Sequence, residues 1–135
     1  MAIPPAAQQF LRDFARAFAA EVRRVFSWRF AIEIVASQPD RLILRSAGRE
    51  IVVDRTRRNI MSGGRLLAPL ASIQSVVISQ FTDDGEPRWW TVILVTDRIG
   101  ELTIGKTSDE SEASIVAARL ATLCDKPVLT RGRSW

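Results

Sequence analysis

The feature that most constrains the fold is a change of hydrophobic period at Phe30. Before this residue, apolar side chains recur every three or four positions, and after it they alternate with polar ones over short runs. A period near 3.6 residues indicates an amphipathic helix, whereas a period of two indicates strands. The pattern therefore predicts one N-terminal helix followed by a series of strands.

Turn signals divide the second part into short strands. Gln38–Asp40, Ala47–Gly48 and Gly63–Gly64 contain the proline and glycine residues that suit tight turns. We predict about seven antiparallel strands joined by such turns. Seven of them cover residues 30–37, 41–46, 49–54, 65–69, 72–81, 88–96 and 101–105, and a further short strand lies within 55–64.

A second helix is predicted from about Asp109 to Cys124. Thr107–Glu110 fits a capping box, and Glu112 adds an acid near the positive end of the helix dipole. A proline, Pro127, follows shortly after and stops the helix. The chain is thus expected to hold an amphipathic helix over 1–29, a domain over 30–129 and a tail over 130–135.

The predicted strand 88–96 needs cover on both sides, because Val92–Val95 is apolar on both faces. The interior of the folded strands covers one face. The other face needs a helix, and the N-terminal helix has the apolar side to supply it, in its own chain or in a neighbour.

The missing residue types exclude several kinds of active site. The chain has no histidine and only one cysteine. Ser-His-Asp and Cys-His catalysis, histidine-ligated metals, zinc fingers and an intrachain disulfide are therefore excluded. The carboxylate pair Asp83 and Asp84 lies in a polar loop without a desolvating pocket, so we expect no enzyme, no cofactor and no metal.

The chain also carries no sign of export or of a membrane span. It has no run of eighteen apolar residues, and its first residues lack the basic and apolar regions of a signal peptide. The lone Cys124 fits a reducing compartment, and beside Asp125 we expect it to be inert. We expect a cytoplasmic protein, with a location peripheral to the inner membrane left open.

The charge is divided along the chain. Residues 1–30 and 31–68 each carry a net charge of +3, whereas 69–124 carry −4. This division suggests two surfaces of opposite sign that could self-associate. Six arginines in the basic half are candidates for binding anionic lipid headgroups or phosphates. They are Arg45, Arg49, Arg55, Arg57, Arg58 and Arg65.

The alternative for this arginine cluster is a solvated strand end at which arginines pair with Glu50 and Asp54. Nucleic acid is not an expected partner, because aromatic residues do not interleave with the arginines and the second half is acidic.

Residues Gly100–Thr107 match the phosphate-loop pattern G-x-x-x-x-G-K-T. The four residues between the glycines alternate polar and apolar, as in a strand. The acids Asp109, Glu110 and Glu112 follow, and they would repel a triphosphate. We interpret the segment as a hairpin strand and expect no nucleotide.

Aromatic residues supply the candidates for an interface. Phe10, Phe14 and Phe18 lie on the apolar side of the N-terminal helix, which packs on the domain, in a dimer or on a membrane. Trp89 and Trp90 are adjacent in a strand and so point to opposite faces. One of them fills the core, and the other packs under the N-terminal helix or anchors a partner.

Several segments resemble bacterial proteins with a pleckstrin-homology-like domain. The resemblance covers about residues 30–129, and three segments carry it: Ile51–Arg58, Pro69–Val76, and the hairpin at Asp97–Gly100 with the helix that ends before Val128. It implies an α+β fold in which about seven antiparallel strands form a roll or partly open barrel, with a C-terminal capping helix. The N-terminal amphipathic helix lies outside that core.

The resemblance also implies binding of lipids, peptides or other proteins. The loop that binds phosphoinositides in eukaryotic members corresponds to Gln38–Arg41, which holds one arginine and one acid, so that route is not expected. We predict a non-enzymatic interaction module whose partner is a protein or a second copy. The alternative is a peripheral membrane adaptor that binds anionic lipid through the Phe-rich helix and the arginine cluster.

Overall fold

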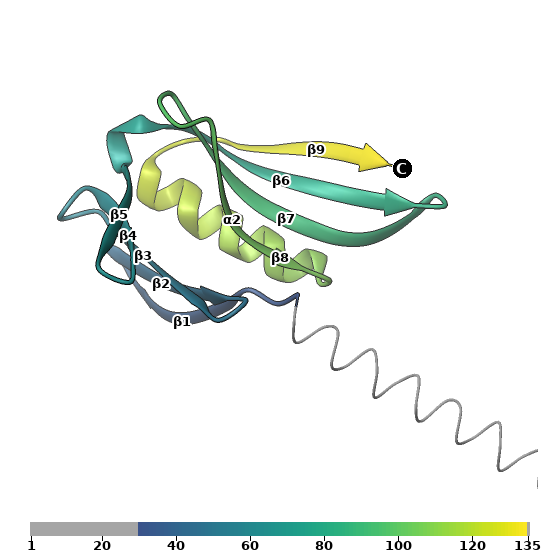
Figure 1. Cartoon of the computed structure of the whole chain (residues 1–135), viewed down its shortest axis with the longest axis horizontal. Helices are drawn as coiled ribbons and strands as arrows, with labels where there is room; N and C mark the ends of the chain where they lie inside the picture. Colours follow the sequence, from purple (N-terminus) through teal and green to yellow (C-terminus); the bar gives the residue numbers. More distant parts are fainter. Residues whose placement is uncertain (1–29, 135) are drawn as a thin grey trace, which may run out of the picture.

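The computed structural model describes residues 30–134, which form two β-sheets with one α-helix between them (Figure 1). The helix, α2, spans Glu110–Cys124 and contacts strands of both sheets. The predicted helix over residues 1–29, with Phe10, Phe14 and Phe18, lies outside the described residues.

The first sheet has five antiparallel strands that follow one another in chain order. The Ala47–Gly48 turn joins the second and third strands, and both of its residues have positive φ angles, 53° and 74°. Such two-residue turns match the twist of the strands they connect. The strands are β1 Glu33–Gln38, β2 Arg41–Ser46, β3 Arg49–Asp54, β4 Asn59–Ser62 and β5 Arg65–Pro69.

The second sheet has four strands in the order β8-β7-β6-β9. A short 3-10 turn, η1 (Leu70–Ser72), leads into it. Strands β6 to β8 are antiparallel, and β9 pairs in parallel with β6 from Val76–Val128 onward. The strands are β6 Ile73–Asp83, β7 Glu86–Thr96, β8 Glu101–Thr107 and β9 Val128–Ser134.

Helix α2 is capped by Asp109, whose side chain accepts hydrogen bonds from the backbone N–H groups of Ser111 and Glu112. The cap is thus Asp109 and not Thr107, which instead accepts a hydrogen bond from the Asp109 N–H. The buried side of α2 joins both sheets in one core. The fully buried large side chains of this core include Leu42, Leu44, Ile51, Ile60, Leu94, Val116 and Leu120.

The predicted fold class is wrong. The described residues form a mostly-β fold of two separate sheets, not an α+β roll of about seven antiparallel strands. The helix does not cap a barrel, because its buried side packs between the sheets. Strand β9 runs through residues 130–134, predicted as a tail, and its parallel pairing with β6 widens the second sheet beyond the predicted hairpins.

Candidate interaction surface

The six arginines predicted as one cluster divide between the two ends of the five-stranded sheet. Arg45 and Arg49 lie at the end where β2 turns into β3, and Arg65 lies at the β4–β5 turn on the same side. The other three, Arg55, Arg57 and Arg58, lie in the β3–β4 turn at the opposite end. The six residues of β3 separate the two groups by about 17 Å. The arginines therefore do not form a single anion site.

Each group has its own surroundings. Arg45 lies between two carboxylates, 3.8 Å from Glu33 and 3.4 Å from Glu50, and Arg57 lies 3.9 Å from Asp54. These ion pairs agree with the alternative of arginines paired at solvated strand ends. Arg55 and Arg58 line an open cavity of about 390 Å³ beside the C-terminal end of α2.

The two adjacent tryptophans lie on opposite faces of the four-stranded sheet, as their spacing predicts. Trp90 packs against the core and lines a cavity of about 190 Å³ near the start of α2. Trp89 lies on the outer face, where its ring stacks on Phe81 with centroids 4.1 Å apart and planes 2° apart. Both rings are partly exposed, so neither is a fully open anchor.

The ammonium of Lys106 lies over the aromatic rings of Trp89 and Phe30. It lies 4.6 Å from the Trp89 ring centroid and 5.0 Å from that of Phe30. Cation–π contacts of this kind contribute about 0.5–1 kcal/mol at exposed sites.

Residues 101–107 are strand β8, so the segment that matches the phosphate-loop pattern is a hairpin strand, as its alternation predicts.

The outer face of the four-stranded sheet carries an ion pair between its two edge strands. Arg131 of β9 donates to Glu101 of β8 over 2.7 Å, and this hydrogen bond raises the pKa of the guanidinium. Two strands lie between these edges, so the pair crosses over β6 and β7. Beneath it, Val77 and Ile93 are each only 5% exposed. This face was predicted to need a helical cover, and the ion pair spans part of it.

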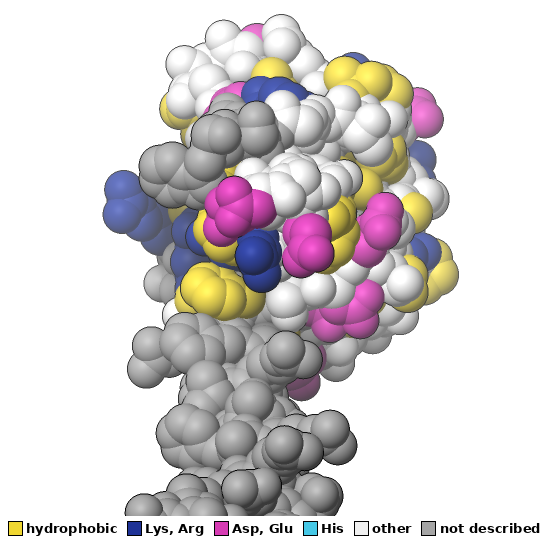
Figure 2. Space-filling view, turned by 90° about the vertical axis from the view of Figure 1, so that its right-hand side faces the viewer, with side chains coloured by type: hydrophobic (Ala, Val, Ile, Leu, Met, Phe, Trp, Pro, Cys, Tyr) yellow, Lys and Arg dark blue, Asp and Glu magenta, His cyan; other side chains and the backbone are white. Residues whose placement is uncertain are grey.

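Acidic side chains gather at the end of the molecule where α2 begins (Figure 2). Asp109, Glu110 and Glu112 contribute to this end, where negative charge favours the N-terminal end of a helix. Glu112 also accepts a hydrogen bond from the backbone N–H of Ile32, which fixes the entry into β1. The acids therefore have a structural role in this fold.

The most unusual surface is an apolar row on the outer face of the five-stranded sheet. The strand register places one apolar residue from each strand beside the next, and we name this row the apolar stripe. Its members are Ala36, Ile43, Val52, Met61 and Leu66. The first four are half-buried by their neighbours, and Leu66 is 56% exposed.

The stripe points away from the core, because Leu42, Leu44, Ile51 and Val53 on either side of it are fully buried. A sheet with one solvated face ordinarily alternates apolar residues inward with polar residues outward. Ile43 and Val52 break that alternation at the centre of the sheet. Apolar rows of this kind, bordered by polar groups, mark interaction sites.

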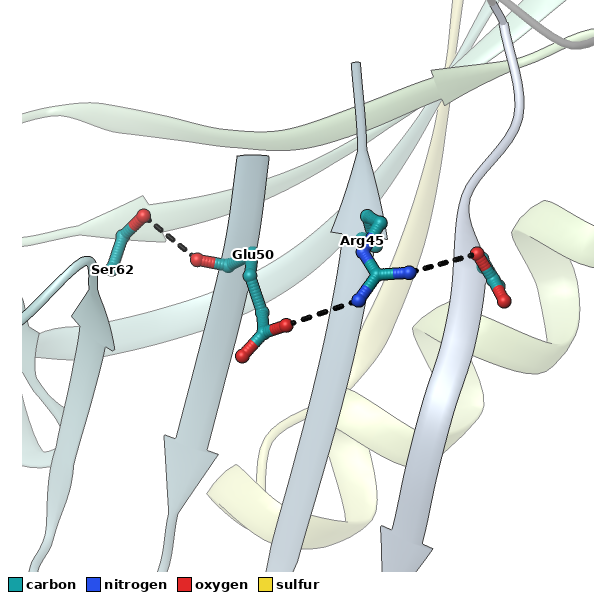
Figure 3. A network of polar contacts seen from close by, with 4 residues as sticks. Arg45, Glu50 and Ser62 are labelled. Atoms are coloured by element: carbon teal, nitrogen blue, oxygen red, sulfur yellow. Dashed lines mark hydrogen bonds and ion pairs between the residues drawn. The ribbon is translucent and has the colours of Figure 1, made fainter. Parts of the chain in front are cut away.

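A polar rim borders the stripe on one side. Arg45 bridges Glu33 and Glu50 across three neighbouring strands, and Ser62 of β4 donates to the Glu50 carbonyl over 2.8 Å (Figure 3). The three charged side chains carry a net charge of −1 and are paired with one another. The arginine of the rim is thus compensated, and the rim as a whole is slightly acidic.

The stripe was not predicted from the sequence. A signal for it exists in the apolar triplets Leu42–Leu44 and Ile51–Val53, which place apolar side chains on both faces of two strands. The same pattern in Val92–Val95 underlies the prediction that strand 88–96 is covered on both faces. Register is what turns separate triplets into one continuous row.

Cys124 is a buried thiol, 8% exposed, and burial raises its pKa from 9.0 to about 11. Nearby Lys126 lowers the pKa by less, so burial is the main cause. We expect iodoacetamide at pH 8 to react about 100-fold more slowly with the folded chain than with the chain in urea, because the thiolate is the reactive form. Mass spectrometry of timed samples measures both rates, and equal rates would contradict the burial.

Within residues 30–134, no three cysteine, aspartate or glutamate side chains come together in a way that suits a metal ion. In the same part of the chain, no helix has the length and apolar character needed to cross a membrane. Searches for related proteins found no matching family model, curated protein or solved structure, so the pleckstrin-homology-like resemblance stays a prediction.

Proposed function

We propose that the chain is a non-enzymatic interaction module that binds a protein through the apolar stripe. The observation that carries this proposal is the unbroken row of five outward apolar residues across five strands. We place the protein in the cytoplasm, where a single unpaired thiol such as Cys124 is ordinary.

A partner that covers the stripe forms a complex that is stabilised by the hydrophobic effect. Removing apolar surface from water stabilises a complex by about 25 cal/mol per Å², and the half-buried members of the row already lie in fixed positions on a sheet. A partner therefore orders few additional side chains. A sheet face is also a rigid element, which favours a defined interface over a loose contact.

The arginines give less support to the alternative of a peripheral membrane adaptor. Binding to anionic lipid through this domain would need the six arginines on one surface, whereas they divide between two ends of the sheet. The rim beside the stripe is internally paired and slightly acidic, which does not favour contact with anionic headgroups. The stripe thus fits a protein surface better than a membrane.

Photo-crosslinking in living cells tests the proposal. A p-benzoylphenylalanine residue replaces Val52 in the stripe, and in a control chain it replaces Ile115, an exposed residue of α2. We expect ultraviolet light to join the Val52 variant to a protein of defined mass, while the Ile115 variant gives no such product. Crosslinks to lipid alone, or no crosslink at position 52, would contradict the proposal.

A matched pair of lysine variants gives the quantitative prediction. Leu66 and Ile115 are both 56% exposed, so Leu66→Lys and Ile115→Lys change the surface to the same extent. With the Val52 crosslinker in place, we expect Leu66→Lys to lower the crosslink yield about tenfold or more, because a charge enters an apolar contact. Ile115→Lys should leave the yield unchanged, and equal losses would remove the stripe from the interaction.

A further inference from the structure

We propose that the partner of the apolar stripe is a second copy of this chain, bound face to face about a two-fold axis. This inference rests on the proposed function and names the partner of the same surface. Two sheets that pack face to face lie about 10 Å apart, with the side chains of the facing layers in contact. The resulting dimer would bury the stripe of each copy against that of the other.

The stripes of two copies have the same length, so each can cover the other completely. The five members of each stripe span about 19 Å, given the usual spacing of neighbouring strands. A two-fold interface uses the same patch on both copies, so its apolar part must match its own outline. An apolar row without polar interruptions meets this condition, because every contact that it makes with itself is apolar.

The symmetry fixes one contact whatever the direction of the axis along the sheet. Val52 is the middle member, with Ala36 and Ile43 on one side and Met61 and Leu66 on the other. Any two-fold rotation that lays the row along itself passes through this middle. Val52 of one copy therefore lies beside Val52 of the second copy.

The charges around the stripe favour a second copy over a strongly charged partner. Arg45 is paired with Glu33 and Glu50, so the rim has no uncompensated cation and only a small net charge. On the opposite side of the stripe, Arg41 of β2 is the register partner of Asp54 of β3, and Arg57 also lies 3.9 Å from Asp54, so these three side chains carry a net charge of +1. A two-fold axis parallel to the stripe sets the slightly acidic rim of one copy opposite the slightly basic side of the other, so the two faces have complementary charge.

Disulfide trapping tests this inference with purified full-length chain. The background variant Cys124→Ala removes the native thiol, Val52→Cys places a thiol at the predicted symmetry axis, and Ile115→Cys serves as the control. We expect mild oxidation to convert most of the Val52→Cys protein to a covalent dimer on a non-reducing gel. The Ile115→Cys protein should stay mostly monomeric under the same conditions. A Val52→Cys protein that oxidises no faster than the control would overturn the inference.

Sedimentation velocity of the unmodified chain gives an independent measurement. We expect a concentration-dependent dimer whose dissociation constant rises about tenfold or more in Leu66→Lys and stays unchanged in Ile115→Lys. A monomer at all concentrations would overturn the inference. If that monomer still crosslinks in cells to a different protein at position 52, the proposed function stands without it, and if it crosslinks to no protein, both fail.

Discussion

Replacing Leu120 by alanine is expected to lower the free energy of unfolding by about 2–5 kcal/mol. Leu120 is fully buried on the side of α2 that lies between the two sheets. Its removal leaves a cavity that touches both sheets, so the surroundings cannot close it by moving one layer alone. Because domains of this size are stable by only about 5–15 kcal/mol, urea denaturation should show a large shift of the midpoint.

Ile115→Ala is the matched control on the same helix. Ile115 is 56% exposed, so its truncation changes little buried surface and should alter the free energy of unfolding by no more than about 0.5 kcal/mol. Both substitutions replace a branched apolar residue of α2 by alanine, a good helix former, so neither weakens the helix itself. A similar loss of stability in both variants would mean that α2 does not lie between the sheets as described.

The local elements of this fold could be predicted because their signals are local. The predicted ranges 41–46 and 49–54 match β2 and β3, and the predicted helix 109–124 differs from α2 by one residue at its start. Turn residues and a capping acid act within a few positions of the chain, so a single sequence contains the whole signal.

The arrangement of these elements could not be predicted in the same way. The pairing of β6 with β9 joins residues about fifty positions apart, and nothing in Val128–Thr130 indicates which strand it will meet. That parallel pair changes a sheet of hairpins into a four-stranded sheet. The placement of α2 between two sheets likewise depends on which apolar faces come together, which is a property of the whole domain.

The candidate site was hard to predict for a related reason. Arginines close in sequence, such as Arg49 and Arg55, are carried to opposite ends of one strand, because each residue of a strand advances the chain by about 3.3 Å. The apolar stripe joins residues from Ala36 to Leu66 that become neighbours only through register. Sequence proximity therefore predicts a cluster that does not form. The apolar triplets Leu42–Leu44 and Ile51–Val53 indicate an apolar outer face on two strands but not which residues of the other strands join them.

A close approach of the two sheets predicts a second large effect, at Gly105 in β8. A Cβ atom added there would lie 2.5 Å from Oγ of Ser46, 2.8 Å from its Cβ and 2.9 Å from Cγ1 of Ile32. The Ser46 hydroxyl can rotate away, but its Cβ moves only with the backbone of β2. Gly105→Ala is therefore expected to push the sheets apart and to cost about 1–3 kcal/mol of stability.

Gly132→Ala is the control, because a Cβ at that position in β9 meets no atom within 4 Å. Both substitutions add one methyl group to a strand glycine of the same sheet, so the loss of glycine's freedom in the unfolded chain is similar in both. Urea denaturation should show a lower midpoint for Gly105→Ala and an unchanged or slightly higher one for Gly132→Ala. If Gly105→Ala were as stable as the parent chain, β8 and β2 could not lie as close as the structure places them.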